Sequence, residues 1–488
     1  MSVFLIFFPL LVSLLIFLVK PAQAKTIAFA ASLVELVATL YAISQFTKNE
    51  TVQFVLDIPW IRALGMNFAV GMDGISLVLV LLTSILIPGI ILSVRSNFAR
   101  PHTFYGLVLM MQMALVGVFV ALDGLLFYLF WEIALIPIYF ICLIWGGEDR
   151  GRITLKFFIY TLAGSLFMLV GLVYLYLATP GDHTFAMNAL YEAGRSLSPK
   201  EQGFIFWLMF VAFAIKMPVF PFHTWQPDTY TVAPTQGTML LSGIMLKMGI
   251  YGVIRWLLPV VPEGVGHWGS TAIVISVIGI IYGSCIAIVQ KDFKRLIAYS
   301  SVAHVGLIAA GTFTLSVMGL QGAMIQMVSH GVVVFGMFYI VDVVADRTKT
   351  GSLESLGGIR NVAPTLATVF VIVMLGSVAL PLTSGFVGEF LLINSIFQYQ
   401  YILGAVAGVT IILGAVYMLR TFQKSMSGEV NNLTARFADL STEEKWVLYP
   451  VVALIILIGI YPGPILELSE PAVTNLLKVY SNLSASVK

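Results

Sequence analysis

The sequence predicts an all-α membrane protein of about 14 transmembrane helices, with two inverted five-helix repeats (helices 4–8 and 9–13) and breaks in helices 7 and 12. Of the 488 residues, 59% are hydrophobic and only 10% are charged, whereas soluble domains carry about 25% charged residues. Long apolar runs recur along the whole chain. Two of them are interrupted by proline and glycine beside an ionisable residue, a pattern typical of transporter repeats.

A spanning helix needs about 20 mostly apolar residues. The runs that meet this length are 1–19, 26–46, 74–94, 104–122, 124–145, 153–178, 203–222, 234–258, 269–290, 295–315, 318–342, 362–398, 401–420 and 446–464. We expect the tail after residue 464 to form a short interfacial helix or a docking segment.

The spans predict four regions. Residues 1–103 would hold helices 1–3, 104–258 the first half-channel repeat, 259–425 the second, and 426–488 the last span and the tail. Most lysines and arginines outside the spans follow odd-numbered spans, for example Arg420, Lys424 and Arg436. Because such residues concentrate on the inner side, we expect both termini to lie on the outer side.

Several ionisable residues fall inside the predicted spans. A charge in hydrocarbon costs at least ~2.5–3.5 kcal/mol on insertion scales, so such residues are rare and usually functional. The six that lie near the middle of a span or beside a break are Glu132, Lys216, Lys247, His304, His330 and Glu389. Since they come from six different spans, they are expected to form a polar axis across the bundle.

A structural interpretation of each residue remains open. Lys247 could be the partner of a buried carboxylate, and either histidine could be a packing residue. Glu35 and Asp342 also fall in apolar runs, near predicted helix ends. We expect these two to be interfacial or pairing residues.

Proton transfer is the chemistry that such an axis supports. A lysine in a low-dielectric medium releases its proton more readily, and an approaching carboxylate restores its hold. The stretch KMPVFPFHTWQPD, residues 216–228, joins Lys216 to a helix break at Pro218 and Pro221. Unwound backbone at membrane depth is tolerated where it lines a cavity or is buried in protein. The lysine and the break are thus expected to form one hydrated switch.

Other chemistries find little support. The net charge of +2 does not suggest a nucleic-acid partner. Two cysteines, Cys142 and Cys285, do not make a metal framework, and the six histidines show no metal-ligand spacing. The glycine pattern GVGHWG (264–269) lies between spans with no preceding strand, so it is not expected to bind a nucleotide. We expect no cofactor or metal in this chain.

The segment KMPVFPFHTWQPDTYTVAPTQGTMLLSGIMLKMGIYG resembles the signature of the antiporter-like membrane subunits of respiratory complex I. FWEIALIPIYFICLIWGGEDR, DFKRLIAYSSVAHVG, GAMIQMVSHG and SGFVGEF fit the same family, and the resemblance runs from about residue 70 to about residue 425. Gln226 and Tyr230 depart from the family's usual residues in the loop after the break.

The resemblance implies roles for the six residues. Glu132 would pair with Lys216, Lys247 and Glu389 would continue the axis, and His304 and His330 would connect them. The chain would be a proton-translocating, non-redox subunit of NADH–quinone oxidoreductase, and NADH, FMN, iron–sulfur clusters and quinone would bind to other subunits.

The implied setting is a hetero-oligomer with other membrane-arm subunits, including sister antiporter-like subunits. It would lie in the lipid bilayer of a bacterial inner membrane rather than an organelle. The alternative is a subunit of a multisubunit Na⁺/H⁺ antiporter or of a membrane-bound hydrogenase, because these proteins share the broken helices and the lysines.

Overall fold

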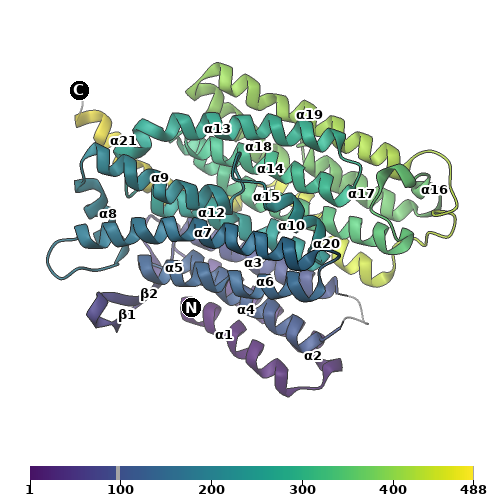
Figure 1. Ribbon diagram of the computed structural model, residues 1–488, viewed down its shortest axis with the longest axis horizontal. Helices are drawn as coiled ribbons and strands as arrows, with labels where there is room; N and C mark the ends of the chain where they lie inside the picture. The colour runs from purple at the N-terminus through teal and green to yellow at the C-terminus, as the bar shows by residue number, and fades with distance from the viewer. Residues whose placement is uncertain (95–98, 487–488) are drawn as a thin grey trace.

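Most helices of the bundle run side by side along one direction, which is horizontal in Figure 1. The structure is a computed structural model that describes residues 1–94 and 99–486. Its α-helices are α1 (Ser2–Leu15), α2 (Pro21–Gln45), α3 (Gly74–Leu92), α4 (Pro101–Val120), α5 (Gly124–Ile133), α6 (Leu135–Trp145), α7 (Arg150–Ala178), α8 (Met187–Ser196), α9 (Pro199–Lys216), α10 (Gln226–Val232), α11 (Thr235–Leu240), α12 (Leu246–Gly252), α13 (Pro262–Val289), α14 (Phe293–Thr312), α15 (Val317–Thr348), α16 (Ile359–Val362), α17 (Pro364–Ser377), α18 (Ser384–Tyr399), α19 (Tyr401–Met426), α20 (Thr442–Ile460) and α21 (Gly463–Ser486).

Short helical segments of other types complete the bundle. Three are 3₁₀ turns, η1 (Ile16–Leu18), η2 (Arg62–Leu64) and η5 (Leu353–Ser355). Two are π-helical, η3 (Leu241–Met245) and η4 (Val253–Leu257), and they flank α12. The span from Thr235 to Leu257 is therefore one helix whose hydrogen bonding changes three times, from α to π, back to α and again to π.

A helix occupies each of the fourteen predicted ranges. Among the described residues, nine helices are long and apolar enough to cross a membrane, or up to ten if α20 and the 63° bend into α21 count as one span. The prediction of a helical membrane protein is confirmed at this level. The count of about 14 and the two inverted repeats stay predictions.

The first long connection contains a β-hairpin, so the prediction of an all-helical chain was wrong there. Strands β1 (Gln53–Ile61) and β2 (Met66–Met72) pair antiparallel. The turn between them ends at Gly65, whose φ of +56° lies in the left-handed region that favours glycine. Pro59 within β1 hid the strand, because proline cannot donate to a strand ladder.

Several helices begin at an identifiable cap. Asp73 and Asp123 accept hydrogen bonds from the first amides of α3 and α5. Ser198 and Glu201 form a reciprocal capping box at the start of α9. The cap at Asp123 fixes the start of α5, which carries Glu132, and the cap at Ser198 fixes the start of α9, which carries Lys216.

The centre of the bundle is formed by the Thr235–Leu257 span and by α15. Other helices enclose both almost completely, whereas α2, α7 and α19 expose most of their apolar surface. Apolar side chains thus lie on the outer surface, and polar side chains are buried inside. This is the arrangement expected of a protein in a lipid bilayer. Lys247 and His330 lie on these two central helices.

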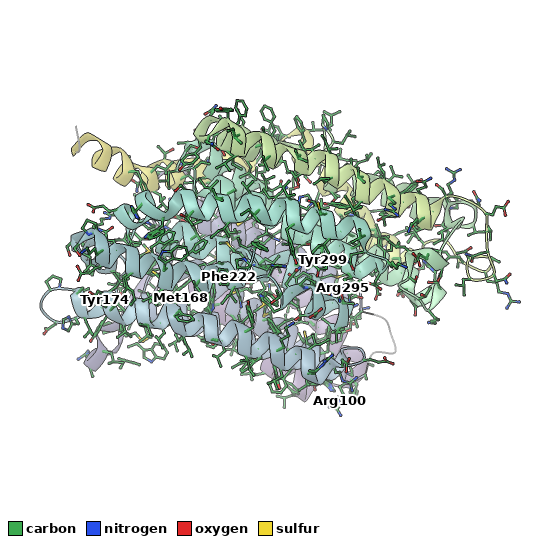
Figure 2. All side chains as sticks on the ribbon, turned by 45° about the horizontal axis from the view of Figure 1, so that its top comes forward. Arg100, Met168, Tyr174, Phe222, Arg295 and Tyr299 are labelled. Carbon is green, nitrogen blue, oxygen red and sulfur yellow. The ribbon has the colours of Figure 1, made fainter. Side chains whose placement is uncertain are left out.

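The connections that follow even-numbered spans meet at one end of the bundle. The hairpin, α8 and the end of α21 lie at the left of Figure 1, and one pocket is lined by Glu50, Asn188, Pro259 and Asn475 from four such segments. Arg100 and Arg295, from odd-numbered connections, lie toward the opposite end from Tyr174 in Figure 2. These connections therefore lie at opposite ends of the bundle according to whether they follow odd- or even-numbered spans, as the predicted order of the spans requires.

The C-terminal tail is a longer element than expected. Helix α21 packs against α3 and α15. Its contact with α3 is close, because a Cβ at Gly74 would lie 1.8 Å from the carbonyl oxygen of Leu468. Ser469 of α21 donates to Gln321 of α15.

Candidate functional site

The first helix break lies directly after Lys216, as the sequence predicts. Helix α9 ends at Lys216, and α10 begins at Gln226. Proline at 218 has no N–H to continue the helix. The Trp225 indole nitrogen donates to the Ile215 carbonyl at 2.9 Å, so Trp225 satisfies a carbonyl that the break would otherwise leave free. The Lys216 side chain is buried.

Lys216 lies against an aromatic ring of the fifth span. Its Nζ is 5.2 Å from the centre of the Trp131 ring, a distance at which an ammonium is attracted to the ring face. Glu132 is the residue after Trp131, and its carboxyl group lies close enough for its charge to act on Lys216. Within the described residues, however, no ion pair joins Lys216 to Glu132.

Glu132 lies beside a second irregularity that the sequence analysis did not identify. The fifth span divides into α5 and α6 at Ala134. Pro137 explains the interruption, because a proline cannot donate to the carbonyl four residues earlier, here that of Ile133. The Oε1 atom of Glu132 is buried and has no hydrogen-bond partner. The carboxyl group is therefore placed at a joint and retains a free acceptor.

Lys247 lies on α12, between the two π-helical segments. Its Nζ donates to the Ser242 carbonyl at 2.6 Å and lies 2.9 Å from Nδ1 of His330. Both contacts are buried. A charged lysine has donors only, so His330 must offer an unprotonated Nδ1 to it. The structural interpretation of Lys247 as the partner of a carboxylate is not what the structure shows, since its partners are a carbonyl and an imidazole.

Glu389 lies on α18, after the second helix break. Helix α17 ends at Ser377 and α18 begins at Ser384. Ala379 and Leu382 between them have φ of 55° and 73°, values in the sparsely populated left-handed region. The break predicted in helix 12 therefore lies within the predicted range 362–398, between Ser377 and Ser384. Glu389 itself is buried in the second turn of α18.

Two side chains meet the Glu389 carboxylate. Oε1 of Glu389 lies 2.9 Å from Nδ1 of His304, at ion-pair distance although the two atoms do not form a hydrogen bond. Gln326 donates to the same oxygen at 3.3 Å. Gln326 was not predicted as a site residue, although it lies one helical turn before His330 on the same face of α15. Gly388 leaves room for it, because a Cβ there would lie 2.3 Å from the Gln326 amide oxygen.

The two histidines join these contacts into one line. The rings of His304 and His330 have their centres 5.8 Å apart. Lys247, His330, His304 and Glu389 therefore follow one another across α12, α15, α14 and α18. Lys216 and Glu132 form a separate group. This group packs closely against the line. A Cβ at Gly249, two residues after Lys247, would lie 2.7 Å from the backbone nitrogen of Met217, the residue after Lys216.

The two further carboxylates differ from each other. Asp342 accepts a hydrogen bond from Thr235 at 2.6 Å, as expected of a pairing residue. Glu35 on α2 is fully buried, and neither carboxyl oxygen has a hydrogen-bond partner among the described residues. The expectation that Glu35 is a pairing residue was therefore wrong, whereas its place relative to the membrane interface stays a prediction. Helices α1, α3 and α4, its neighbours along the chain, pack against α2, but the apolar run does not reveal which face of α2 they cover.

Metal-binding geometry is absent from the part of the chain that the structure describes: no group of three or more histidine, cysteine, aspartate or glutamate residues could hold a metal ion. Of the two cysteines, Cys142 is buried and Cys285 is exposed. The segment containing GVGHWG belongs to α13, a single long helix, and has no strand before it.

The fold and these buried groups define a multi-pass membrane protein with an ionisable interior. The family model described as NADH:quinone oxidoreductase/Mrp antiporter, TM, matches residues 121–414. NADH-quinone oxidoreductase subunit M of Rickettsia prowazekii is 39% identical to this chain, over 97% of each sequence.

Two solved structures share the fold. One is from respiratory complex I of Thermus thermophilus with bound NADH, with a TM-score of 0.89, 29% identity, and coverage of 98% of this chain and 100% of that one. The other is from the Mrp complex of Dietzia sp., with a TM-score of 0.88 and 20% identity, covering 100% and 99%; at this identity it shows the fold alone.

The chain belongs to the NADH:quinone oxidoreductase/Mrp antiporter family of membrane subunits. The predicted resemblance to the antiporter-like subunits of complex I is confirmed, and within them the resemblance is to subunit M, which relatives also name chain 4.

Proposed function

We propose that this chain is the subunit M type of a proton-translocating NADH–quinone oxidoreductase and moves a proton through its buried Glu/Lys/His axis. The observation that carries the proposal is the line of contacts Lys247–His330–His304–Glu389, with 2.9 Å separations at both ends. All four side chains are buried in the bundle. A structural role would require partners that cancel the buried charges, whereas the partners of Lys247 among the described residues are the Ser242 carbonyl and His330.

Lys216 and Glu132 form the switch at the entrance to this line. At an effective dielectric of about 20, moving a carboxylate from about 4 Å to about 8 Å from an ammonium changes their interaction by about 2 kcal/mol. This is about a 30-fold change in the lysine's affinity for its proton. Motion at the α5–α6 joint or at the break after Lys216 therefore suffices to load and unload the lysine.

Histidine carries the proton between Lys247 and Glu389. Imidazole accepts a proton on one nitrogen and donates from the other, and its ordinary pKa lies close to neutral pH. A proton moves along this line between Lys247, Nδ1 of His330, His304 and the Glu389 carboxylate. Only N–H and O–H bonds form and break, so no redox group in this chain takes part.

The two groups belong to the two predicted repeats. Glu132, Lys216 and Lys247 lie in 104–258, and His304, His330 and Glu389 lie in 259–425. The line therefore joins the two regions, so that a proton can pass between them. The region 1–103 and the segment 426–488 flank the two half-channels.

Electron transfer from NADH to quinone takes place on other subunits, which bind FMN and iron–sulfur clusters as well. The partners of this chain are the other membrane-arm subunits, including sister antiporter-like subunits, and the lipid bilayer. The location is a bacterial inner membrane, which the bacterial relatives at 39% identity support.

A subunit of a multisubunit Na⁺/H⁺ antiporter is the second candidate. It is favoured by the family model, which covers both classes, and by the shared fold of the Mrp chain. The higher identity to an NADH-quinone oxidoreductase subunit, 39% against 20%, favours the first candidate.

The discriminating experiment is purification of the chain from native membranes in mild detergent, followed by mass spectrometry of the proteins that co-migrate. We expect flavin- and iron–sulfur-containing NADH dehydrogenase subunits in the same particle. Recovery with small hydrophobic antiporter subunits alone, and with no redox protein, would move the chain to the antiporter class.

A further inference from the structure

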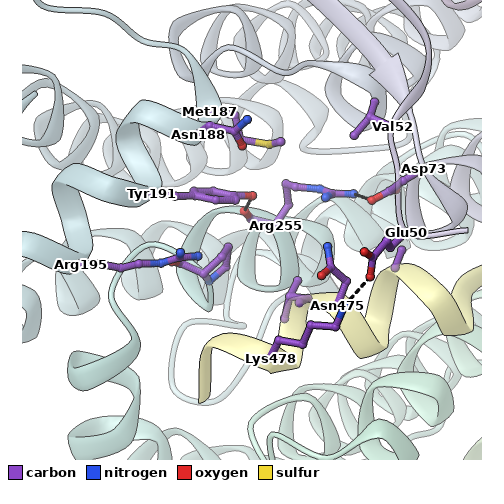
Figure 3. A pocket seen from close by; sticks show the side chains of 13 residues that line it. Glu50, Val52, Asp73, Met187, Asn188, Tyr191, Arg195, Arg255, Asn475 and Lys478 are labelled. Carbon is purple, nitrogen blue, oxygen red and sulfur yellow. Dashed lines mark hydrogen bonds and ion pairs between the residues drawn. The ribbon is translucent and has the colours of Figure 1, made fainter. Parts of the chain in front are cut away.

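A polar pocket opens at the end of the bundle that carries the hairpin, α8 and α21. Its volume is about 420 Å³. Figure 3 shows that Tyr191 and Arg195 approach it from α8, Glu50 and Val52 from the hairpin connection, and Asn475 and Lys478 from α21. Lipid does not favour a surface of this polarity, so the pocket is suited to water.

A buried ion pair lies in the wall of this pocket. Arg255 of η4 donates to the Asp73 carboxylate, and the two side chains are 9% and 5% exposed. Asp73 also caps α3 through the amide of Ser76. The Nε atom of Arg255 is buried and has no hydrogen-bond partner among the described residues. One nitrogen donor of the guanidinium group is therefore left unsatisfied by the ion pair.

One face of a single span connects the ion pair to Lys247. Lys247, Tyr251 and Arg255 are spaced four residues apart, which places them on one side of the helix over a rise of about 12 Å. The guanidinium carbon of Arg255 lies 5.7 Å from the centre of the Tyr251 ring. The Tyr251 hydroxyl donates to the Phe119 carbonyl at 2.8 Å. The π-helical segments on both sides of α12 give this face freedom to rotate, since such segments are less regular than an α-helix.

We propose that the Asp73–Arg255 pair is a gate between the buried axis and the aqueous pocket. When the pair is closed, Arg255 and Tyr251 separate Lys247 from the water of the pocket. When the pair opens, water enters beside Tyr251. A proton from the Lys247 ammonium passes to this water, is accepted by the freed Asp73 carboxylate, and leaves to the pocket. No other bond changes, and no group is oxidised or reduced.

This inference rests on the proposed function, because a gate needs a proton to release. It adds an exit at the pocket end, reached along the Thr235–Leu257 span. It also assigns a role to Asp73, which the sequence analysis did not single out. The expected orientation of both termini toward the outer side places this exit on the outer face.

The first test uses the assembled complex in proteoliposomes with the variant Asp73→Asn, which keeps the shape of the side chain and removes its charge. We expect NADH oxidation to continue, the ratio of protons moved to electrons transferred to fall, and passive proton leak without turnover to rise. The matched control is Glu444→Gln, which removes the charge from the partly buried Arg347–Glu444 pair at the other end. We expect the control to couple as the wild type does.

The second test covers the case in which Asp73→Asn fails to assemble, and it leaves the pair intact. Cysteines at Asn475→Cys, in the pocket, and Ser76→Cys, behind the pair, are exposed to a membrane-impermeant thiol reagent added from the outer face. We expect position 475 to react at all times and position 76 to react faster during turnover with NADH and quinone. Equal labelling of position 76 with and without turnover overturns the gate.

The outcomes separate the two proposals. If Lys247→Ala stops proton movement while Asp73→Asn couples as the wild type does, the axis stands and the gate is wrong. If both variants couple as the wild type does, the proposed function is wrong as well.

Discussion

The ammonium group of Lys216 lies 5.2 Å from the centre of the Trp131 ring, and among the described residues it forms no ion pair with the neighbouring Glu132. Lys216 therefore lies near Glu132, its proposed partner, without forming an ion pair with it. Because Trp131 and Glu132 are adjacent and lie next to the α5–α6 joint at Ala134, one movement of this joint shifts both groups relative to Lys216.

Replacing Trp131 tests whether the ring positions the lysine. A cation–π contact contributes about 0.5–2 kcal/mol. We therefore expect Trp131→Leu to lower the ratio of Lys216 side chains in this position to those in other positions by roughly 2- to 30-fold. We expect a slower initial rate of NADH-driven proton uptake into proteoliposomes. Trp131→Phe is the matched control, because it keeps an aromatic face. Equal rates for the Leu variant and the wild type would show that the ring has no positioning role.

Gly249 is expected to be required for the contact between the two groups of the site. A Cβ there would lie 2.7 Å from the Met217 nitrogen and 2.8 Å from the Phe213 carbonyl oxygen, and backbone atoms cannot yield easily. We expect Gly249→Ala to cost about 1–3 kcal/mol of stability, measured as a lower thermal midpoint of the purified complex. Gly266→Ala is the control, because nothing lies within 4 Å of its Cβ. A Gly249→Ala complex as stable as the control would contradict the close packing.

Removing His304 interrupts the line before Glu389. We expect His304→Ala to lower proton translocation less than loss of Lys216 does, because water can replace part of an imidazole relay. We also expect normal assembly, measured by native gel electrophoresis of solubilised membranes. His183→Ala is a suitable control, since His183 contacts Thr179 away from the axis. Disappearance of the complex in the His304 variant alone would indicate a structural residue.

Asp439 makes a pH-dependent contribution outside the spans. Burial acts to raise the pKa of this carboxyl group, but hydrogen bonds from Thr365, Leu366 and Leu440 outweigh it and hold the pKa below its usual value. Its stabilising effect is therefore present above the unfolded pKa of about 3.9 and is lost as the pH falls through the folded value.

Because Asp439 caps the first amides of α17, we expect Asp439→Ala to lower stability by about 1 kcal/mol. The difference in thermal midpoint between this variant and the wild type should stay constant from about pH 8 to about pH 5. A difference that grows or vanishes within this interval would contradict the assignment.

The sequence predicted the broken helices because their causes are local. Pro218 lies two residues after Lys216, Pro381 lies within the second break, and Gly385 is the second residue of α18. The joint at Ala134 had a local signal too, in Pro137, but the apolar run continues through it and conceals the interruption. The π-helical segments beside Lys247 contain no proline. Gly243 in η3 is not a sufficient signal, because Gly237 and Gly249 of the same span lie in regular α-helix.

The contacts of the site were less predictable, because they join residues that are far apart in the chain. Lys247 meets His330 83 residues later, and Gln326 meets Glu389 63 residues later. Periodicity places Lys247 on a buried face but does not select its partner. Glu35 differs, because α2 packs against its chain neighbours α1, α3 and α4, and the apolar run does not show which face of α2 they cover.

The most direct test of the central claim is the ratio of protons moved to electrons transferred by the assembled complex carrying Lys216→Ala or Glu132→Ala, with Lys200→Ala as control. We expect assembly to remain largely intact and proton translocation to be nearly abolished in both variants, while the control pumps normally. Assembled Lys216→Ala complex that pumps at the wild-type ratio would show that the switch is not at Lys216.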